Sequence, residues 1–398
     1  MALIFPAINA FSQKADFENA MKLIEKKKNY AEAGRIIEPF LNDSAYSGNA
    51  ELKYMAGRIN MAEFDDNKFI LERDPRNSKV DPLSSAKKLI SGYDLLRDAL
   101  KYSSSSANPL SEKRIKEGKS LINNHHSDYL EAGNIFYQEK DYPSAFRSFM
   151  LYSSLPEDEI ADRHVKATSD SLINIGYFNA ALAAFADKDV DSTLKAFSYN
   201  DSPSGVDSTK ISLQLSSFLA KLDEKTIHSD TLTSNRIHNE IEKLSYKGLE
   251  SFGDKIPGFL NVYIISLASA GKGQLAHEAV DSLLSKQPAD ARLLALKGYL
   301  YDIDGEDDKS IESYKKAAAV RGVSADILKR TALKCYKVGS KRLKECEEGD
   351  VTGKEKIKDD LILYAQKTAF KAYKEKPSDE EIGKIRDMID YSVERFYQ

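Results

Sequence analysis

The chain has 398 residues, with 58 Lys and Arg against 62 Asp and Glu, and its formal net charge is −4. Hydrophobic residues make up 41% of it, which is typical of a globular protein and excludes a collagen-like or wholly disordered chain. Charges of both signs are spread along the length and we identify no basic stripe, which argues against a dedicated nucleic-acid binder. With only 11 Pro and 20 Gly, the composition favours helices, and we predict an all-α protein.

The first stretch, Met1–Ser12, is apolar and uncharged, but it is shorter than the ~20 residues that cross a bilayer. It resembles the hydrophobic part of a secretory signal peptide, with Ala10 and Ser12 at the positions read before cleavage, although a basic start is missing. Two interpretations stay open. A truncated signal peptide would place the protein in the periplasm or cell envelope, whereas an apolar cap on the first helix would suit a cytoplasmic protein. No other segment approaches the length of a membrane span.

A spacing of small and aromatic residues recurs along the chain. Counted from Gly133, offsets 0, 3, 12, 16 and 19 hold Gly133, Phe136, Ala145, Phe149 and Tyr152. The same offsets recur at Met21, Ile24, Ala33, Ile37 and Phe40, at Ala181, Ala184, Thr193, Phe197 and Asn200, and at Gly298, Tyr301, Ser310, Tyr314 and Ala317. Adjacent copies differ by 34 residues, as Leu267, Ala276, Val280 and Leu283 show against Tyr301, Ser310, Tyr314 and Ala317.

Each copy is expected to be a hairpin of two helices. Small residues at offsets 0 and 12 let the helix axes approach to about 8–10 Å, and larger residues at the other offsets fill the space between hairpins. We therefore expect Gly133 and Ala145 to be contacts between paired helices. Acidic residues in the turns, Asp141, Asp189 and Glu306, are predicted to cap the second helices.

These residues resemble the tetratricopeptide repeat (TPR) family, through the motif Gly133-x-x-Phe136 followed by Lys140-Asp141-Tyr142-x-x-Ala145. The layout is similar to envelope-associated members common in Bacteroidetes bacteria. The resemblance implies an all-α, right-handed α-solenoid of stacked helix-turn-helix hairpins, whose first helices line a concave, partner-binding face. The chain departs from the family pattern in having no Trp, and in Ser310 and Thr193 where Ala is usual.

The expected organisation follows the hairpins in chain order. We predict an apolar leader over residues 1–12, irregular hairpins over 13–102, a Ser-rich join over 103–110, a solenoid over 111–377 and a capping helix over 378–398. The last repeat, Ser324–Pro377, is expected to have lengthened helices.

We find no pattern that indicates catalysis, a cofactor or a metal. The pair His125-His126 is interpreted as a solvated helix start, and the glycine-rich run 271–274 lacks the spacing of a phosphate-binding loop. The acidic run 302–308 has the wrong register for a calcium loop. On one helix, Cys335 and Cys346 would lie about 16 Å apart, beyond the ~7 Å that a disulfide allows.

The favoured function is a non-catalytic protein–protein interaction scaffold that binds a peptide or partner domain, with no nucleic acid and no cofactor. Residues expected to point away from the hairpin core are the candidate contacts, namely Leu130, Asn134, Tyr137, Arg292, Tyr299 and Asp302. The clamp for chaperone tails known in this family needs paired lysines and asparagines, and only Asn134 matches. Two alternatives remain: a helical envelope enzyme or carbohydrate-handling protein, and a repeat-containing regulator.

Overall fold

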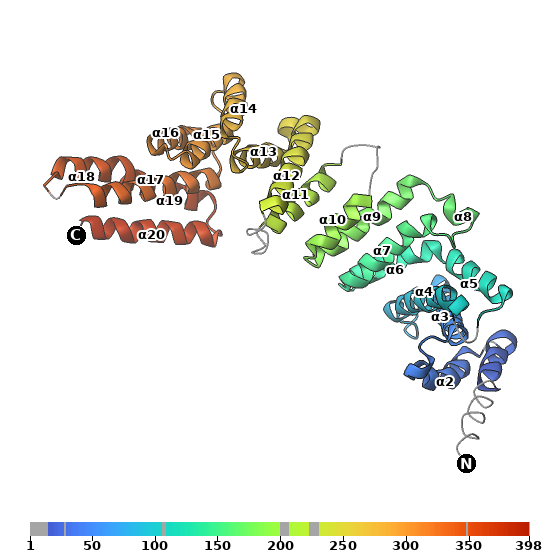
Figure 1. The fold of residues 1–398 in the computed structure, drawn as a ribbon. Helices are drawn as coiled ribbons and strands as arrows, with labels where there is room; N and C mark the ends of the chain where they lie inside the picture. The colour runs from blue at the N-terminus through green and yellow to red at the C-terminus, as the bar shows by residue number, and fades with distance from the viewer. Residues whose placement is uncertain are drawn as a thin grey trace, which may run out of the picture. The chain divides into compact units, whose positions relative to one another are not determined.

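The computed structural model describes residues 15–27, 29–105, 109–199, 207–222, 231–347 and 349–397 (Figure 1). Regular structure within these ranges is entirely helical, which confirms the predicted all-α class. The chain divides into two compact units, Met1–Lys221 and Leu222–Gln398. The leader Met1–Ser12 and the repeat position Asn200 lie outside the described residues.

The first unit is a series of helices, most of them paired with the next along the chain. In order these are η1 (Leu23–Lys27), α2 (Tyr30–Leu41), η2 (Ser44–Tyr46), α3 (Ala50–Arg73), α4 (Pro82–Tyr102), η3 (Ser103–Ser105), α5 (Glu112–Asn124), α6 (His126–Gln138), α7 (Tyr142–Ser154), η4 (Leu155–Glu157), α8 (Arg163–Lys166), α9 (Asp170–Ala186), α10 (Val190–Tyr199) and α11 (Ser208–Leu222). The predicted Ser-rich join lies between α4 and α5, where Ser103 Oγ accepts a hydrogen bond from Leu110 N at 2.9 Å. Residues 106–108 of that join are outside the described ranges.

The second unit continues the helical pairing. It contains α12 (Thr231–Phe252), η5 (Gly253–Lys255), α13 (Pro257–Ser269), α14 (Gly273–Lys286), α15 (Ala291–Ile303), α16 (Asp307–Ala319), α17 (Ala325–Glu345), α18 (Val351–Ile357), η6 (Lys358–Leu363), α19 (Tyr364–Glu375) and α20 (Glu380–Tyr397). In Figure 1, α17, α19 and α20 lie side by side at the C-terminal end of this unit. Helices begin at capping residues such as Asp290 and Ser324, whose side chains accept backbone N–H groups that the first turn leaves unpaired.

The repeated residues form the contacts within hairpins, as predicted. A Cβ atom at Gly133 would lie 2.5 Å from the Phe149 ring, and one at Gly298 would lie 2.9 Å from the Tyr314 ring. In the α15–α16 hairpin, Ser310 takes the place of the usual Ala and donates a hydrogen bond to Gly298 O at 2.9 Å. The departure from the family pattern therefore keeps the helices close and satisfies the buried hydroxyl.

The turns share one backbone geometry. Four hairpins have a left-handed residue at the same offset from the repeat start, at Lys140 (φ 61°), Lys188 (φ 63°), Gly271 (φ 73°) and Gly305 (φ 76°). Asp141 and Asp189 then cap α7 and α10, as predicted. In the turn Gly305-Glu306-Asp307, the predicted carboxylate in the first turn of α16 is supplied by Asp307, whereas the Glu306 side chain makes no cap hydrogen bond and pairs instead with Lys309 at 3.2 Å. Glutamate has one more methylene group than the short side chains that suit this position.

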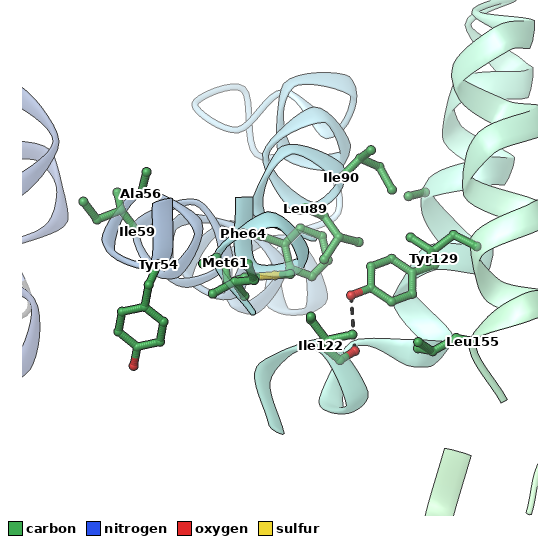
Figure 2. Packing of buried hydrophobic residues seen from close by; sticks show 14 of the residues in the cluster. Tyr54, Ala56, Ile59, Met61, Phe64, Leu89, Ile90, Ile122, Tyr129 and Leu155 are labelled. Atoms are coloured by element: carbon green, nitrogen blue, oxygen red, sulfur yellow. Dashed lines mark hydrogen bonds between the residues drawn. The ribbon is translucent and has the colours of Figure 1, made fainter. Parts of the chain in front are cut away.

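The core of the first unit is continuous from its N-terminal helices to α10. Figure 2 shows Tyr129 and Ile122 within it, where the Tyr129 hydroxyl donates to Ile122 O at 3.2 Å. Helices α3 and α4 approach closely because a Cβ at Gly57 would be only 3.0 Å from Gly92 O. The second unit holds separate apolar clusters around α13–α15, α15–α17 and α17–α20.

Candidate functional site

A cavity of about 810 Å³ lies in the second unit, and we call it the α17 groove. Four helices supply its walls, with α17 contributing most of the side chains. The lining residues are Tyr299 and Asp302 from α15, Tyr314 from α16, Arg330, Leu333, Lys334, Tyr336, Lys337, Ser340, Lys341 and Lys344 from α17, and Met388 from α20. The volume falls within the range of ordinary ligand sites.

One face of α17 is strongly basic. Its cations follow alternating steps of four and three residues, at Arg330, Lys334, Lys337, Lys341 and Lys344, and this spacing keeps them on one side of a helix. Across Ala325–Glu345 there are seven Lys and Arg but two Asp and Glu. The expectation that the chain carries no basic stripe is therefore wrong, because the near-neutral total charge conceals a local excess.

One cation of this face, Lys334, is buried and paired. Its side chain is 6% exposed and its ammonium binds the carboxylates of Asp302, and of Asp307 at 2.7 Å. Burial alone would lower the pKa of Lys334, but the two carboxylates raise it, so this lysine stays charged. The same hydrogen bond holds the pKa of Asp307 below its usual value. This ion cluster joins the start of α16 and the end of α15 to α17.

The other four cations of this face are available to a ligand. Arg330, Lys337, Lys341 and Lys344 are exposed, and none forms a salt bridge with any residue that the structure describes. Neighbouring acidic groups are already engaged, since Asp308 binds Arg342 at 2.8 Å. The groove therefore presents an excess of positive charge that no salt bridge to a described residue neutralises.

Between these charges the groove is aromatic and apolar. Its tyrosines come from three helices, and burial raises the pKa of Tyr314 to about 12. The Tyr336 hydroxyl lies 2.6 Å from Ser392 Oγ, which ties α20 to α17 and places Met388 at the edge of the groove. Ser340 Oγ is buried without a hydrogen-bond partner among the described residues.

Two of the six predicted contact residues, Tyr299 and Asp302, line the α17 groove. Tyr299 is half-buried, while Asp302 is exposed but held by Lys334. Arg292, although on the same helix, lies in a separate cleft of about 10 Å³ between α13, α14 and α15, with its guanidinium 3.0 Å from Asp290. The structure does not bring Arg292 into the groove.

The remaining three predicted residues lie on α6 in the first unit. Leu130 is half-buried against the core, Asn134 is exposed, and Tyr137 is exposed with its ring centroid 5.4 Å from that of Tyr142. None of them lines a cavity described for this unit. A cavity of about 340 Å³ between α3, α4 and α6 instead opens beside Asp128 and Ile135, on the opposite side of α6.

The two adjacent histidines belong to the core of the first unit. His125 and His126 are 5% and 8% exposed, so the interpretation as a solvated helix start is wrong. His125 Nδ1 lies 2.8 Å from Asp128 Oδ2, and His126 Nε2 lies 2.7 Å from Tyr152 O while its ring stacks on that tyrosine. Burial would raise the pKa of Asp128, but hydrogen bonds from His125 and Lys68 lower it. Local sequence alone could not show that the turn before α6 is covered by α3 and α7.

Within the described ranges, no group of three or more His, Cys, Asp and Glu side chains is placed to hold a metal ion. Of the helices that the structure describes, none is long and apolar enough to cross a membrane.

Sequence reasoning found the α15 side of the groove and missed the α17 side. The missing signal was present as the four-three spacing of Arg330 to Lys344, in a segment expected to be one long helix. Met388 carries no comparable signal, because its place depends on how α20 packs.

No protein-family model and no curated protein matches the chain. Solved structures with a similar arrangement include yeast Tom70, at 12% identity over 97% of this chain and 89% of that chain, with a TM-score of 0.31. They also include the APC/C hetero-tetramer Cut9–Hcn1, at 11% identity over 97% and 76% with a TM-score of 0.30, and the P58(IPK) TPR domain, at 13% identity over 81% and 97% with a TM-score of 0.22. Likenesses this distant support no conclusion about function. The assignment of stacked TPR-like hairpins rests on the hairpins themselves.

Proposed function

We propose that the protein is a non-catalytic interaction scaffold that holds a segment of a partner protein in the α17 groove. The observation that carries this proposal is the combination of an aromatic, apolar cavity and four unpaired cations on rigid helices. Aromatic and Arg side chains dominate the energetics of protein interfaces, and helical repeats commonly bind partners through such surfaces.

The charge states of the groove favour binding over catalysis. A catalytic lysine usually needs a lowered pKa, whereas the pKa of Lys334 is raised. Behind this face, burial raises the pKa of the Cys335 thiol to about 11, which disfavours the reactive thiolate. These groups suit an electrostatic contact surface.

A blocking substitution tests the proposal. Ser340→Trp should fill the groove, while Asn134→Ala with Tyr137→Ala alters the predicted contact surface of the first unit. Tagged full-length variants are used to capture partners from the native cells, and the captured proteins are quantified by mass spectrometry. We expect Ser340→Trp to lose partners that the double variant keeps. Loss of partners in the double variant alone would indicate that the partners bind at α6.

We further propose that the protein is located in the bacterial cell envelope. The apolar stretch Met1–Ser12 supports this location, and so does the similarity of the repeat layout to envelope-associated proteins of Bacteroidetes. Mass spectrometry of the native protein tests the location. We expect a mature N-terminus near Gln13 in the periplasm; an intact Met1 in the cytoplasm would contradict it.

A further inference from the structure

We infer that the segment bound in the α17 groove is acidic and carries a bulky apolar side chain, and this inference rests on the proposed function. The partner class follows from what the groove leaves unsatisfied: positive charge along its length and an apolar surface between the charges.

The positive charge extends along most of α17. From Arg330 to Lys344 the helix advances about 21 Å at 1.5 Å per residue. Lys337 lies midway, about 10 Å from Arg330 and about 10 Å from Lys344, and Lys341 lies between Lys337 and Lys344. An extended chain advances about 3.3 Å per residue, so acidic residues about three positions apart would match this spacing.

The protein's own acidic groups do not neutralise this surface. Asp302 and Asp307 are both held by Lys334, and Asp308 is held by Arg342. Next to Arg330 in α17, Lys329 is paired with Glu381 at 2.8 Å. The Lys334–Asp302 pair lies in the lining of the groove, and the other four cations of the lining form no salt bridge with the described residues.

The apolar part of the groove calls for a second kind of contact. Leu333, Tyr336 and Met388 line it, and Met388 is 42% exposed. Covering these surfaces with an apolar side chain would remove them from water, at about 25 cal/mol per Å². A purely acidic ligand would leave the apolar lining exposed to water, whereas an acidic segment with one apolar side chain would both pair with the cations and cover the apolar lining.

The surroundings favour a peptide over nucleic acid. The turn 302–308 contains five acidic residues and lies beside the groove, through Asp302. Each of these acidic groups is itself bound by a neighbouring side chain, so the choice of a peptide rests on the apolar lining. A phosphate backbone would leave Leu333 and Met388 in contact with water, whereas an apolar side chain would cover them.

The experiment begins with a random 12-residue peptide library, displayed and selected against the full-length chain. A synthetic peptide from the selection is then titrated by fluorescence anisotropy. We expect the selected peptides to be enriched in Asp and Glu with one bulky apolar residue, and their binding to weaken as salt is raised.

Two variants, each with four cationic side chains replaced by Gln, distinguish the effect of charge in the groove from the effect of charge elsewhere on the protein. One carries Arg330→Gln, Lys337→Gln, Lys341→Gln and Lys344→Gln. Its matched control carries Lys356→Gln, Lys367→Gln, Lys371→Gln and Lys374→Gln, four exposed lysines on α18 and α19. We expect the groove variant to bind at least about tenfold more weakly and the control to stay within about twofold, with both variants melting as the parent does.

The outcomes distinguish this inference from the proposed function. Neutral or basic selected peptides that Ser340→Trp still blocks would overturn the acidic chemistry and leave the groove as the binding site. Peptides that bind Ser340→Trp normally would overturn the proposed function itself. Single-stranded DNA of 20 nucleotides and vesicles containing phosphatidylserine are titrated in parallel. Tighter binding of either one, lost in the groove variant, would replace the acidic peptide with a general polyanion.

Discussion

At the scale of single residues, the hairpins depend on two glycine positions where the packing leaves no room for a side chain. Gly133 lies against the ring of Phe149, and Gly298 lies against the ring of Tyr314. Both rings are nearly buried, at 1% and 4% exposed, so neither can move aside without disturbing the core. Each glycine therefore acts as a contact surface, and its backbone freedom plays no part in the hairpin.

Adding one methyl group at Gly133 should therefore destabilise the protein. Alanine gains up to about 1 kcal/mol in helix propensity, but overpacking against Phe149 costs about 1–3 kcal/mol, so we expect Gly133→Ala to lower the free energy of unfolding. Gly34, in α2, has nothing within 4 Å of its added Cβ, and Gly34→Ala should instead be neutral or stabilising. Chemical denaturation measures both; equal effects would contradict the contact.

The ion cluster around Lys334 makes a prediction about pH. The substitution Lys334→Met leaves Asp302 and Asp307 without their shared cation. We expect it to lower the free energy of unfolding by about 1–2 kcal/mol near pH 7, a loss limited by the partial exposure of both carboxylates. Because the folded-state pKa of Asp307 is lowered from 3.8, its stabilising contribution is present above that value and is lost as pH falls through the folded pKa.

The difference between Lys334→Met and the parent should therefore shrink as the pH falls below 3.8 and through the folded-state pKa of Asp307. Urea unfolding at several pH values measures it. A difference that stays constant on acidification would show that the lysine contributes through packing alone.

At the scale of helices and turns, one geometry recurs in four hairpins. The amide after each left-handed residue donates to a carbonyl five residues earlier, as in Asp141 N to Phe136 O and Glu306 N to Tyr301 O, both 2.9 Å. Two of these turns use Lys at the left-handed position and two use Gly. A side chain there costs energy that glycine avoids.

Exchanging these residues should change stability in opposite directions. We expect Lys140→Gly to raise the free energy of unfolding by up to about 1 kcal/mol, and Gly305→Ala to lower it by about 1 kcal/mol. Gly273→Ala, just after the Gly271 turn, serves as a control because that position has no positive φ. Thermal unfolding followed by circular dichroism would detect the shifts, and a stabilised Gly305→Ala would contradict the shared turn.

Hairpins could be predicted from the sequence because their constraints are local. Small residues such as Gly133 and Ala145 recur at fixed offsets, and a helical period converts those offsets into contacts. The histidines of the α5–α6 turn could not be placed, because their burial depends on α3 and α7. Only part of the α17 groove could be predicted for a related reason. The repeat offsets single out Tyr299 as a residue outside the predicted hairpin contacts, whereas Met388 comes from a helix that no repeat offset describes.

At the scale of the whole molecule, each unit has its own apolar clusters. Every residue lining the α17 groove belongs to Leu222–Gln398. The structure thus assigns the candidate binding surface to one unit.

A fragment of residues 223–398 should therefore fold and bind alone. We expect helical circular dichroism, a cooperative melt and an affinity for the selected acidic peptide within about threefold of the full chain. An unfolded fragment would mean that the second unit needs the first for stability. A folded fragment without affinity would mean that the first unit supplies contacts.

Binding of the partner segment in the α17 groove can be followed at the methionine methyl groups. Met388 lines the groove, whereas Met21, Met55, Met61 and Met150 lie in the first unit. The full-length chain labelled with ¹³C at the methionine methyl groups is titrated with the selected peptide and followed by NMR. Binding in the groove should shift the Met388 signal and leave the signals of these four first-unit methionines in place. Shifts at the first-unit methionines with Met388 unchanged would contradict it.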